Sequence, residues 1–420
     1  TLLFLLAATI QWGQAVSADP ALRENAEKLL LSAEEIGEFV SEYRGLPFLA
    51  PVEKRVQSRI ETEQFLVTRV EEEFTREEIE GAEALLRRLH RLAGDYDDYT
   101  STVDVLTEQI SGMYDYKDGF LALAEWIPLE LQKPILVHEM THALQDQHFG
   151  LENYLSPEVD NDDRAMALSA LVEGDASLVM FAYTLMPDGR SVTDVPDFIE
   201  LVSRQFAFME AASPKLSSSP RYIKETIMFA YSYGAEFVKD IVAVKGWEGL
   251  NEIYRDPPAT TEQIMHPEKF ILSRDLPQDA EEAARKQFGD FTGQEPSPVS
   301  NVLGEFTLFL MLREHLDEKT AKRGADGWDG DYIALHRSGP GKDEILQMTL
   351  IWDSAFEAEE FLSVFDSYLL QRFGESAGKT RDTDISLKSI KQKNSIDIKN
   401  EGTMVYISIN FPGCGLKPSA

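Results

Sequence analysis

Residues 135–144 read Ile-Leu-Val-His-Glu-Met-Thr-His-Ala-Leu, and this stretch decides how the rest of the chain is interpreted. Its apolar residues predict a buried helix over 134–148, with His138 and His142 one turn apart on the same face. Two imidazoles so placed can share one cation, while Glu139, about 100° further round the helix, can hold a water molecule. The pattern predicts a metal site with a carboxylate base beside it. The alternative is a pair of histidines that only fill a core.

A third protein ligand is needed, because tetrahedral zinc held by two histidines and a water keeps one further position. The best candidate is Glu173, since it lies in a helix predicted over 163–184 whose other residues are mostly apolar, and a carboxylate there needs a partner. Asp175 is the alternative ligand and otherwise suits a supporting role. A third histidine shortly after the motif would indicate a metzincin. The remaining histidines do not supply one near this helix: His90, His266, His315 and His336.

Two polar residues at the end of the first helix have more than one interpretation. Asp146 follows His142 by one turn and could orient its imidazole, or could be a solvated acid at the helix end. His148 points away from the His138 direction, so packing or hydrogen bonding is expected of it.

The charge and the cysteine content exclude several classes of partner and site. The 420 residues include 73 acidic and 40 basic ones, a net charge of −33. Such a surface repels phosphate backbones and anionic lipids, so nucleic acid and membrane surfaces are not expected as partners. The one cysteine, Cys414, excludes an internal disulfide and a cysteine-based zinc site.

The N-terminal segment predicts export. Its apolar run is too short to span a bilayer, and Val16-Ser17-Ala18 fits a cleavage site of small residues before Asp19. Residues 1–18 are therefore interpreted as a signal peptide. The mature chain is expected to be secreted or periplasmic, without membrane insertion.

The periodicity along the chain predicts an α+β protein. A hairpin is expected over 112–123, followed by the two ligand helices and by helices near 194–212 and 221–245. A helix at 300–319 leads into an antiparallel sheet near 331–337, 344–352, 384–388, 394–398 and 403–410, with a helix at 355–373. The predicted divisions are an N-terminal helical segment at 19–100, a mostly helical catalytic domain with a small sheet at 101–274, a linker at 275–299 and a C-terminal α+β domain at 300–420.

These residues resemble the gluzincins, the thermolysin-like branch of zinc peptidases, and more closely a group of uncharacterised bacterial gluzincin-like proteins. The resemblance rests on HEMTHALQDQHF at 138–149, the Glu-Gly-x-Ala pattern at 173–176, Tyr-Ser-Tyr-Gly at 231–234 and PATTEQIMHPEK at 258–269. It implies that His138, His142 and Glu173 bind Zn²⁺ and that Glu139 is the general base. One departure is Ser177, where thermolysin-like enzymes have an aspartate, so the support behind the histidines must differ.

The resemblance also implies how a substrate binds. An extended peptide would pair along the strand within 112–124, and Tyr231 or His266 would donate to the oxyanion of the reaction intermediate. For both residues packing or hydrogen bonding is the alternative. The expected function is hydrolysis of a peptide or protein substrate by a zinc-activated water. The alternatives are a zinc-binding protein without activity, whose C-terminal domain binds a partner, and a zinc hydrolase of another amide or ester.

Overall fold

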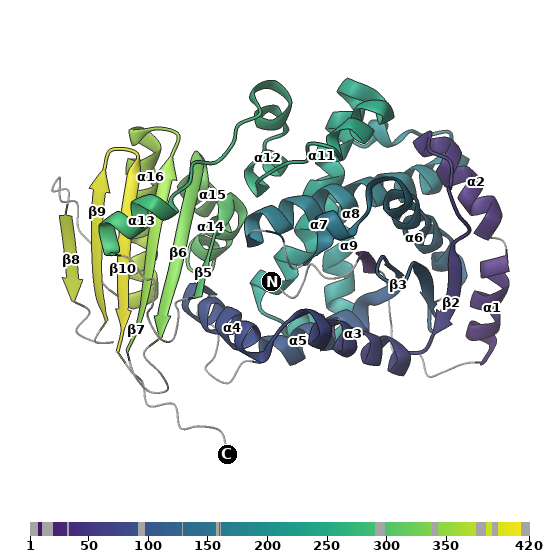
Figure 1. Cartoon of the computed structure of the whole chain (residues 1–420), viewed down its shortest axis with the longest axis horizontal. Coiled ribbons are helices and arrows are strands. Elements are labelled where there is room, and N and C mark those ends of the chain that lie inside the picture. The colour runs from purple at the N-terminus through teal and green to yellow at the C-terminus, as the bar shows by residue number, and fades with distance from the viewer. Residues whose placement is uncertain are drawn as a thin grey trace, which may run out of the picture.

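The computed structural model has a mostly helical body (Figure 1). A six-stranded sheet and the helices that pack on it form the other end of the molecule. The structure describes residues 7–10, 20–31, 33–90, 97–127, 129–156, 159, 161–289, 299–337, 343–374, 384–388 and 394–412. The predicted cleavage site at 16–18 and Cys414 lie outside these residues. The arrangement confirms the predicted α+β class.

The N-terminal part of the body contains a small four-stranded sheet. Its strands run in the order β1 (Ala7–Ile10), β3 (Ile110–Asp115), β4 (Phe120–Ala124) and β2 (Glu53–Gln57). β3 and β4 form the predicted antiparallel hairpin, while β2 adds in parallel to β4 and β1 adds antiparallel to β3. The N-terminal helices of this part are α1 (Pro20–Leu31), α2 (Ala33–Arg44), α3 (Arg59–Glu73), α4 (Arg76–His90) and α5 (Asp98–Gln109).

Three long helices form the centre of the body: α6 (Leu129–Phe149), α8 (Asp162–Leu185) and α11 (Arg221–Ile253). Asn161 caps α8 by accepting a hydrogen bond from the Arg164 amide. By length and composition the stretch Asp162–Asp188 could cross a membrane, but 89% of its apolar window is buried in this fold. Packing therefore accounts for its apolar composition.

Shorter elements complete the body: α7 (Glu152–Leu155), α9 (Phe198–Ala212), α10 (Pro214–Ser218), α12 (Thr261–Met265) and the 3-10 or π turns at 186–188, 192–194 and 269–273. A linker was expected over 275–299, but part of this stretch is helical. It contains α13 (Glu281–Phe288), and Ala280 and Ala284 are buried. The Gln278 amide also donates to the Asp329 carbonyl, so this stretch packs onto the C-terminal part. Residues 290–298 are not described.

The C-terminal sheet is antiparallel throughout, as predicted. Its order is β5 (Val299–Asn301), β6 (Trp328–Arg337), β7 (Glu344–Trp352), β10 (Met404–Phe411), β9 (Ser395–Glu401) and β8 (Asp384–Lys388). α14 (Gly304–Arg313), α15 (Glu318–Ala325) and α16 (Ala355–Phe373) pack together beside it. The single helix expected over 300–319 is instead a strand and two helices.

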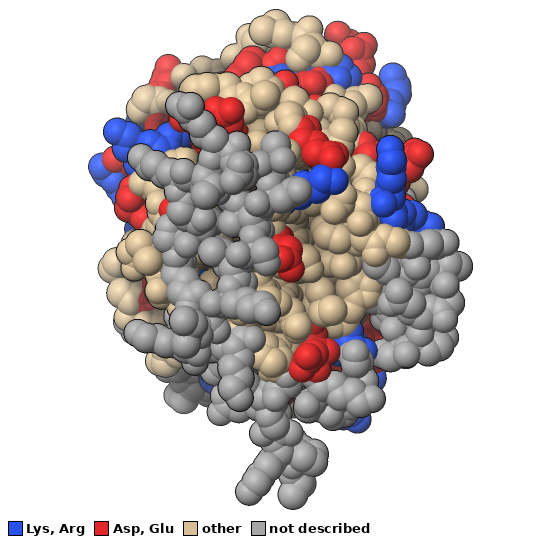
Figure 2. Space-filling view, turned by 90° about the vertical axis from the view of Figure 1, so that its left-hand side faces the viewer, with Lys and Arg blue, Asp and Glu red and all other residues tan. Residues whose placement is uncertain are grey.

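Alternation along β10 places helices on both faces of this sheet. Phe411 contacts Phe373 of α16, and Val405 and Ile407 share its face, whereas Tyr406 points the other way and contacts Phe288 of α13. On the face at the β8 side, acidic and basic side chains are interspersed among uncharged ones (Figure 2).

Candidate metal centre

The two ligand helices bring three predicted metal ligands into contact. His138 Nε2 lies 2.9 Å from His142 Nε2 and 3.1 Å from Glu173 Oε2, and the His142–Glu173 distance is 3.5 Å. Both histidines are fully buried and Glu173 is only 3% exposed. These three residues form a group that can hold a metal ion.

The separations fit a tetrahedral ion. Ligand atoms about 2.1 Å from zinc at tetrahedral angles lie about 3.4 Å apart. The three distances, 2.9, 3.1 and 3.5 Å, lie within about 0.5 Å of that value. The donor set is therefore already arranged around one point.

The electrostatics of His138 and Glu173 match the ionisation that a metal requires of its ligands. Burial and the neighbouring His142 lower the pKa of His138 to about 4, so its imidazole is neutral near pH 7. Burial would raise the pKa of Glu173, but His142 and His138 lower it well below the ordinary range, so the carboxylate stays ionised. Without a metal, Glu173 raises the pKa of His142 despite the burial of that imidazole. A bound cation would take over the role of that proton.

Gln145 is the residue behind His142, and it was not predicted. Its Oε1 lies 2.8 Å from His142 Nδ1, while its Nε2 donates to the Val172 carbonyl at 3.0 Å and to the Tyr254 hydroxyl at 2.9 Å. Because both contacts of Nε2 are to acceptors, Oε1 must accept from His142 Nδ1. That tautomer leaves the lone pair of His142 Nε2 pointing to the metal position.

A buried network extends from Gln145 to Asp175. The Tyr254 hydroxyl donates to Asp175 Oδ2 at 2.9 Å, and Asp175 also pairs with Arg44, whose Nε is 2.8 Å from Oδ1. Arg44 and Asp175 are 1% and 0% exposed. Asp175 is not a member of the group of three ligands. It contacts Gln145 through Tyr254, which agrees with the supporting role that was one of its two sequence interpretations.

Glu139 is also fully buried and faces β3. A Cβ atom at Gly112 of β3 would lie 3.1 Å from Glu139 Cγ and 3.2 Å from its Oε1. Because Gly112 has no side chain, the carboxylate of Glu139 can lie close to the strand. The base candidate lies next to the strand for which peptide pairing is predicted.

Glycines also set the position of the third ligand. A Cβ at Gly174 would lie 2.2 Å from the Gly234 carbonyl, and a Cβ at Gly234 would lie 2.2 Å from the Ala170 carbonyl oxygen. α8 and α11 therefore touch backbone to backbone beside Glu173. The same stretch of α11 carries Tyr231, whose ring centroid is 6.1 Å from that of His138.

The other singled-out residues have partners elsewhere. His266 Nε2 lies 3.0 Å from Glu305 Oε1 in a second cluster at α14. His148 contacts the Pro47 carbonyl at 2.7 Å, which confirms hydrogen bonding as its role. Asp146 does not orient an imidazole. It accepts from the Tyr114 hydroxyl and the Leu151 amide, each at 2.9 Å, because its side chain turns toward β3 and the loop after α6.

A cavity of about 600 Å³ lies apart from this trio. Residues of α4, the start of α8, β5 and α14 line it, including Leu85, Met166 and Leu310. None of the three grouped ligands lines it, so the chemistry and the cavity are separate features of the described residues.

The family match lies in the C-terminal part of the chain. A family model, Domain of unknown function (DUF8575), matches residues 291–413, a range that contains β5 to β10 and neither α6 nor α8. No curated protein matches the chain. A solved structure described as "a putative hydrolase with a novel fold from Chloroflexus aurantiacus" is similar over 65% of this chain and 96% of that chain, with 17% identity and a TM-score of 0.33. A TM-score this low carries over neither a fold nor an activity.

Proposed function

We propose that this chain is a gluzincin-type zinc peptidase that is secreted or periplasmic and hydrolyses peptide bonds with Glu139 as general base. The observation that carries the proposal is the buried trio of His138, His142 and Glu173, whose ligand atoms are 2.9 to 3.5 Å apart. Two neutral imidazoles and one carboxylate are a ligand set of catalytic zinc sites.

The chain's own residues would hold Zn²⁺ and prepare the reaction around it. When bound, zinc supplies a Lewis acid at this site and makes water a better nucleophile near neutral pH. Gln145 fixes the tautomer and the orientation of His142 through the 2.8 Å contact with its Nδ1. Glu139, next to His138 on α6, accepts the proton of the attacking water and can return it to the leaving amine.

The sheet edge beside Glu139 supports a peptide as the substrate. Residues 7–10 pair antiparallel with β3, with Thr9 opposite Gly112, so an extended backbone fits there next to the base. These residues belong to the predicted signal peptide. Its removal would leave β3 as an edge strand open to a substrate.

Tyr231 is the proposed donor to the oxyanion. It lies on α11, which Gly234 holds against the ligand helix α8, and its ring lies beside that of His138. A hydroxyl group at this place suits the charge that develops on the carbonyl oxygen in peptide hydrolysis. His266 supports such a role less well, because its Nε2 contacts Glu305.

Metal analysis of a matched pair of histidine variants tests the site. His142→Ala is expected to bind one zinc per chain fewer than the wild type. His148→Ala removes another histidine of α6, one that contacts the Pro47 carbonyl, and should keep the wild-type zinc content. Equal zinc contents in His142→Ala and the wild type would contradict the proposal, as would a wild-type chain that takes up no zinc.

A further inference from the structure

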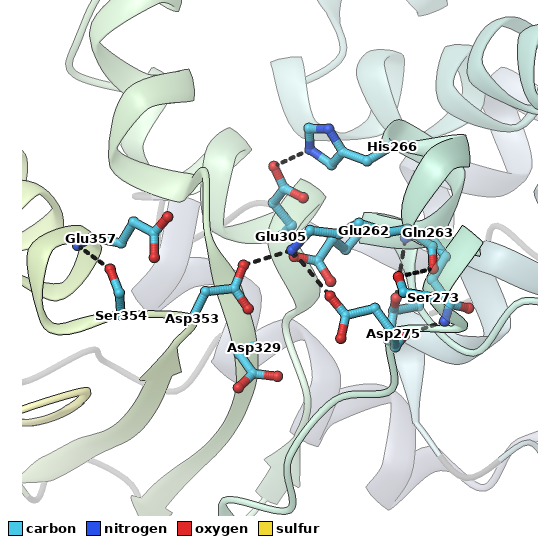
Figure 3. Close-up of polar contacts among 12 residues, drawn as sticks. Glu262, Gln263, His266, Ser273, Asp275, Glu305, Asp329, Asp353, Ser354 and Glu357 are labelled. Carbon is cyan, nitrogen blue, oxygen red and sulfur yellow. Dashed lines mark hydrogen bonds and ion pairs between the residues drawn. The ribbon is translucent and has the colours of Figure 1, made fainter. Parts of the chain in front are cut away.

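A second cluster of ligand-type side chains lies where the helical body meets the C-terminal part. His266 follows α12, Glu305 lies in the first turn of α14, and Asp326 follows α15. His266 Nε2 is 3.0 Å from Glu305 Oε1, and one ligand atom from each of the three residues lies within 4.8 Å of the other two. Figure 3 shows the His266–Glu305 contact above the carboxylates of Glu262, Asp353 and Asp275.

Two oxygen atoms of this cluster are buried and have no hydrogen-bond partner among the residues that the structure describes. Glu305 is 0% exposed, and within the described part of the chain its Oε2 has no hydrogen-bond partner. Asp326 Oδ1 is likewise buried and makes no hydrogen bond to a described residue. Leaving such buried groups without a hydrogen bond is unfavourable, and more so when they are charged. The arrangement is explained if both oxygens face a ligand.

The charges around the cluster show which kind of ligand fits. Lys269 is already shared, since its Nζ lies 2.6 Å from Glu262, 2.7 Å from Asp353 and 3.4 Å from Asp275. His266 is therefore the cation candidate left for Glu305 and Asp326 among the residues with printed contacts here. Buried carboxylates without matching positive charge need a cation or a proton.

We propose that His266, Glu305 and Asp326 bind a second divalent transition-metal ion, of the Zn²⁺ or Mn²⁺ class. An imidazole with two carboxylates suits these ions, whereas Ca²⁺ and Mg²⁺ prefer sites built only from oxygen. The site is separate from the proposed catalytic trio and does not depend on peptidase activity. It gives His266 a role other than oxyanion stabilisation.

The ion would act as a structural link. Its ligands come from the end of α12 in the body and from α14 and α15 in the C-terminal part, so binding would fix these three segments relative to one another. A metal that binds only the folded chain stabilises it in proportion to the logarithm of its concentration. Loading this site should therefore raise the melting temperature of the full chain.

Zinc titration of the metal-free full chain tests the proposal, with competition by a chelator to measure each affinity. The wild type is expected to bind two zinc ions per chain. Asp326→Asn should weaken the second affinity by at least about tenfold, since even the loss of an indirect contact costs that much. The matched control is Asp353→Asn, which removes an equal charge from the same region but no proposed ligand. It should bind two ions like the wild type.

Two further variants keep the outcome clear. His142→Ala should lose the first ion and keep the second, which separates failure of the catalytic site from failure of this one. Asp326 is only half-buried, so its asparagine variant tests the site even if Glu305→Gln does not fold. The proposal is overturned if the folded wild type binds no zinc beyond the trio. It is equally overturned if Asp326→Asn binds like the wild type, or if Asp353→Asn weakens the second affinity as much.

Discussion

Gln145 shows at the residue scale how one side chain decides whether a histidine is ready to bind a metal. Its amide is fixed by the Val172 carbonyl and the Tyr254 hydroxyl, so its Oε1 holds the Nδ1 proton of His142. The sequence could have indicated this role, because Gln145 lies three residues after His142 and so on the same face of the helix. Asp146 was the candidate for orienting His142 instead, because carboxylates often accept a hydrogen bond from a ligand imidazole.

Replacing Gln145 should weaken zinc binding without removing a ligand. In Gln145→Leu the imidazole of His142 loses its orienting acceptor, and the zinc affinity of the trio is expected to fall about 10- to 100-fold. Chelator competition measures the change. Gln147→Leu is the control, since Gln147 lies on the same helix but contacts the backbone at Leu49 and Ala50. Equal affinities in the two variants would refute the role of Gln145.

Gly112 is expected to matter for the base rather than for the metal. A methyl group there would lie 2.6 Å from Ile135 and 3.2 Å from Glu139 Oε1, so Gly112→Ala should displace the carboxylate. We expect kcat to fall roughly 100-fold while zinc stays bound. Met113→Leu, a conservative change at the next residue of β3, should retain kcat. Zinc loss in Gly112→Ala would show that the glycine serves the fold instead.

At the scale of elements, strong local signals were sufficient to place some helices. α16 has the predicted bounds, and in the structure Ser354 caps its start while Gly374 adopts a positive φ at its end. α6 was expected to begin at Pro134, but it begins at Leu129 and carries the proline inside. The short α12 and α13 were not predicted, although local signals mark both: Thr260 caps the start of α12, and α13 has acidic residues in its first turn and basic residues in its last.

The contact between α8 and α11 carries the third ligand and can be tested by itself. In Gly234→Ala the new methyl group meets the Ala170 carbonyl at 2.2 Å, so the helices must separate. We expect a loss of about 1–3 kcal/mol in the free energy of unfolding together with weaker zinc binding. Gly37→Ala is the control, since its methyl group meets the flexible end of Met140 at 3.1 Å and Phe48 at an ordinary contact distance of 3.6 Å. Urea unfolding compares the two, and equal losses would contradict the role given to the helix contact.

At the scale of the whole molecule, the net charge of −33 was evident from the sequence, but the burial of individual acids was not. The three metal ligands were predicted because their signals are local: His138 and His142 lie four residues apart on one helix, and Glu173 lies in an apolar stretch of another. The pairing of Arg44 with Asp175 joins residues 131 positions apart, and the cluster at His266 joins three separate helices. Such contacts follow from tertiary packing, so local spacing and periodicity in the sequence give no signal for them.

One buried acid predicts how stability changes with pH. Burial raises the pKa of Asp163 from 3.8 to about 7, although Thr261 donates two hydrogen bonds to it. The folded chain therefore binds this proton more tightly than the unfolded chain, and its contribution to stability is lost as pH rises from about 4 to about 7. Asp163→Asn keeps the acceptor oxygen and should reduce the stability lost between pH 5 and pH 8 by roughly 1–4 kcal/mol. Urea unfolding of both proteins measures the difference, and identical pH slopes would contradict this assignment.

The central claim is that a zinc-bound trio and Glu139 together hydrolyse peptides. The most direct test compares the wild type with Glu139→Gln, both loaded with zinc, on a mixed peptide library analysed by mass spectrometry. The account predicts that the wild type cleaves peptides, and that Glu139→Gln binds zinc equally but cleaves about 10²- to 10⁴-fold more slowly. Equal cleavage by the two proteins, or no cleavage by the zinc-loaded wild type, would contradict it.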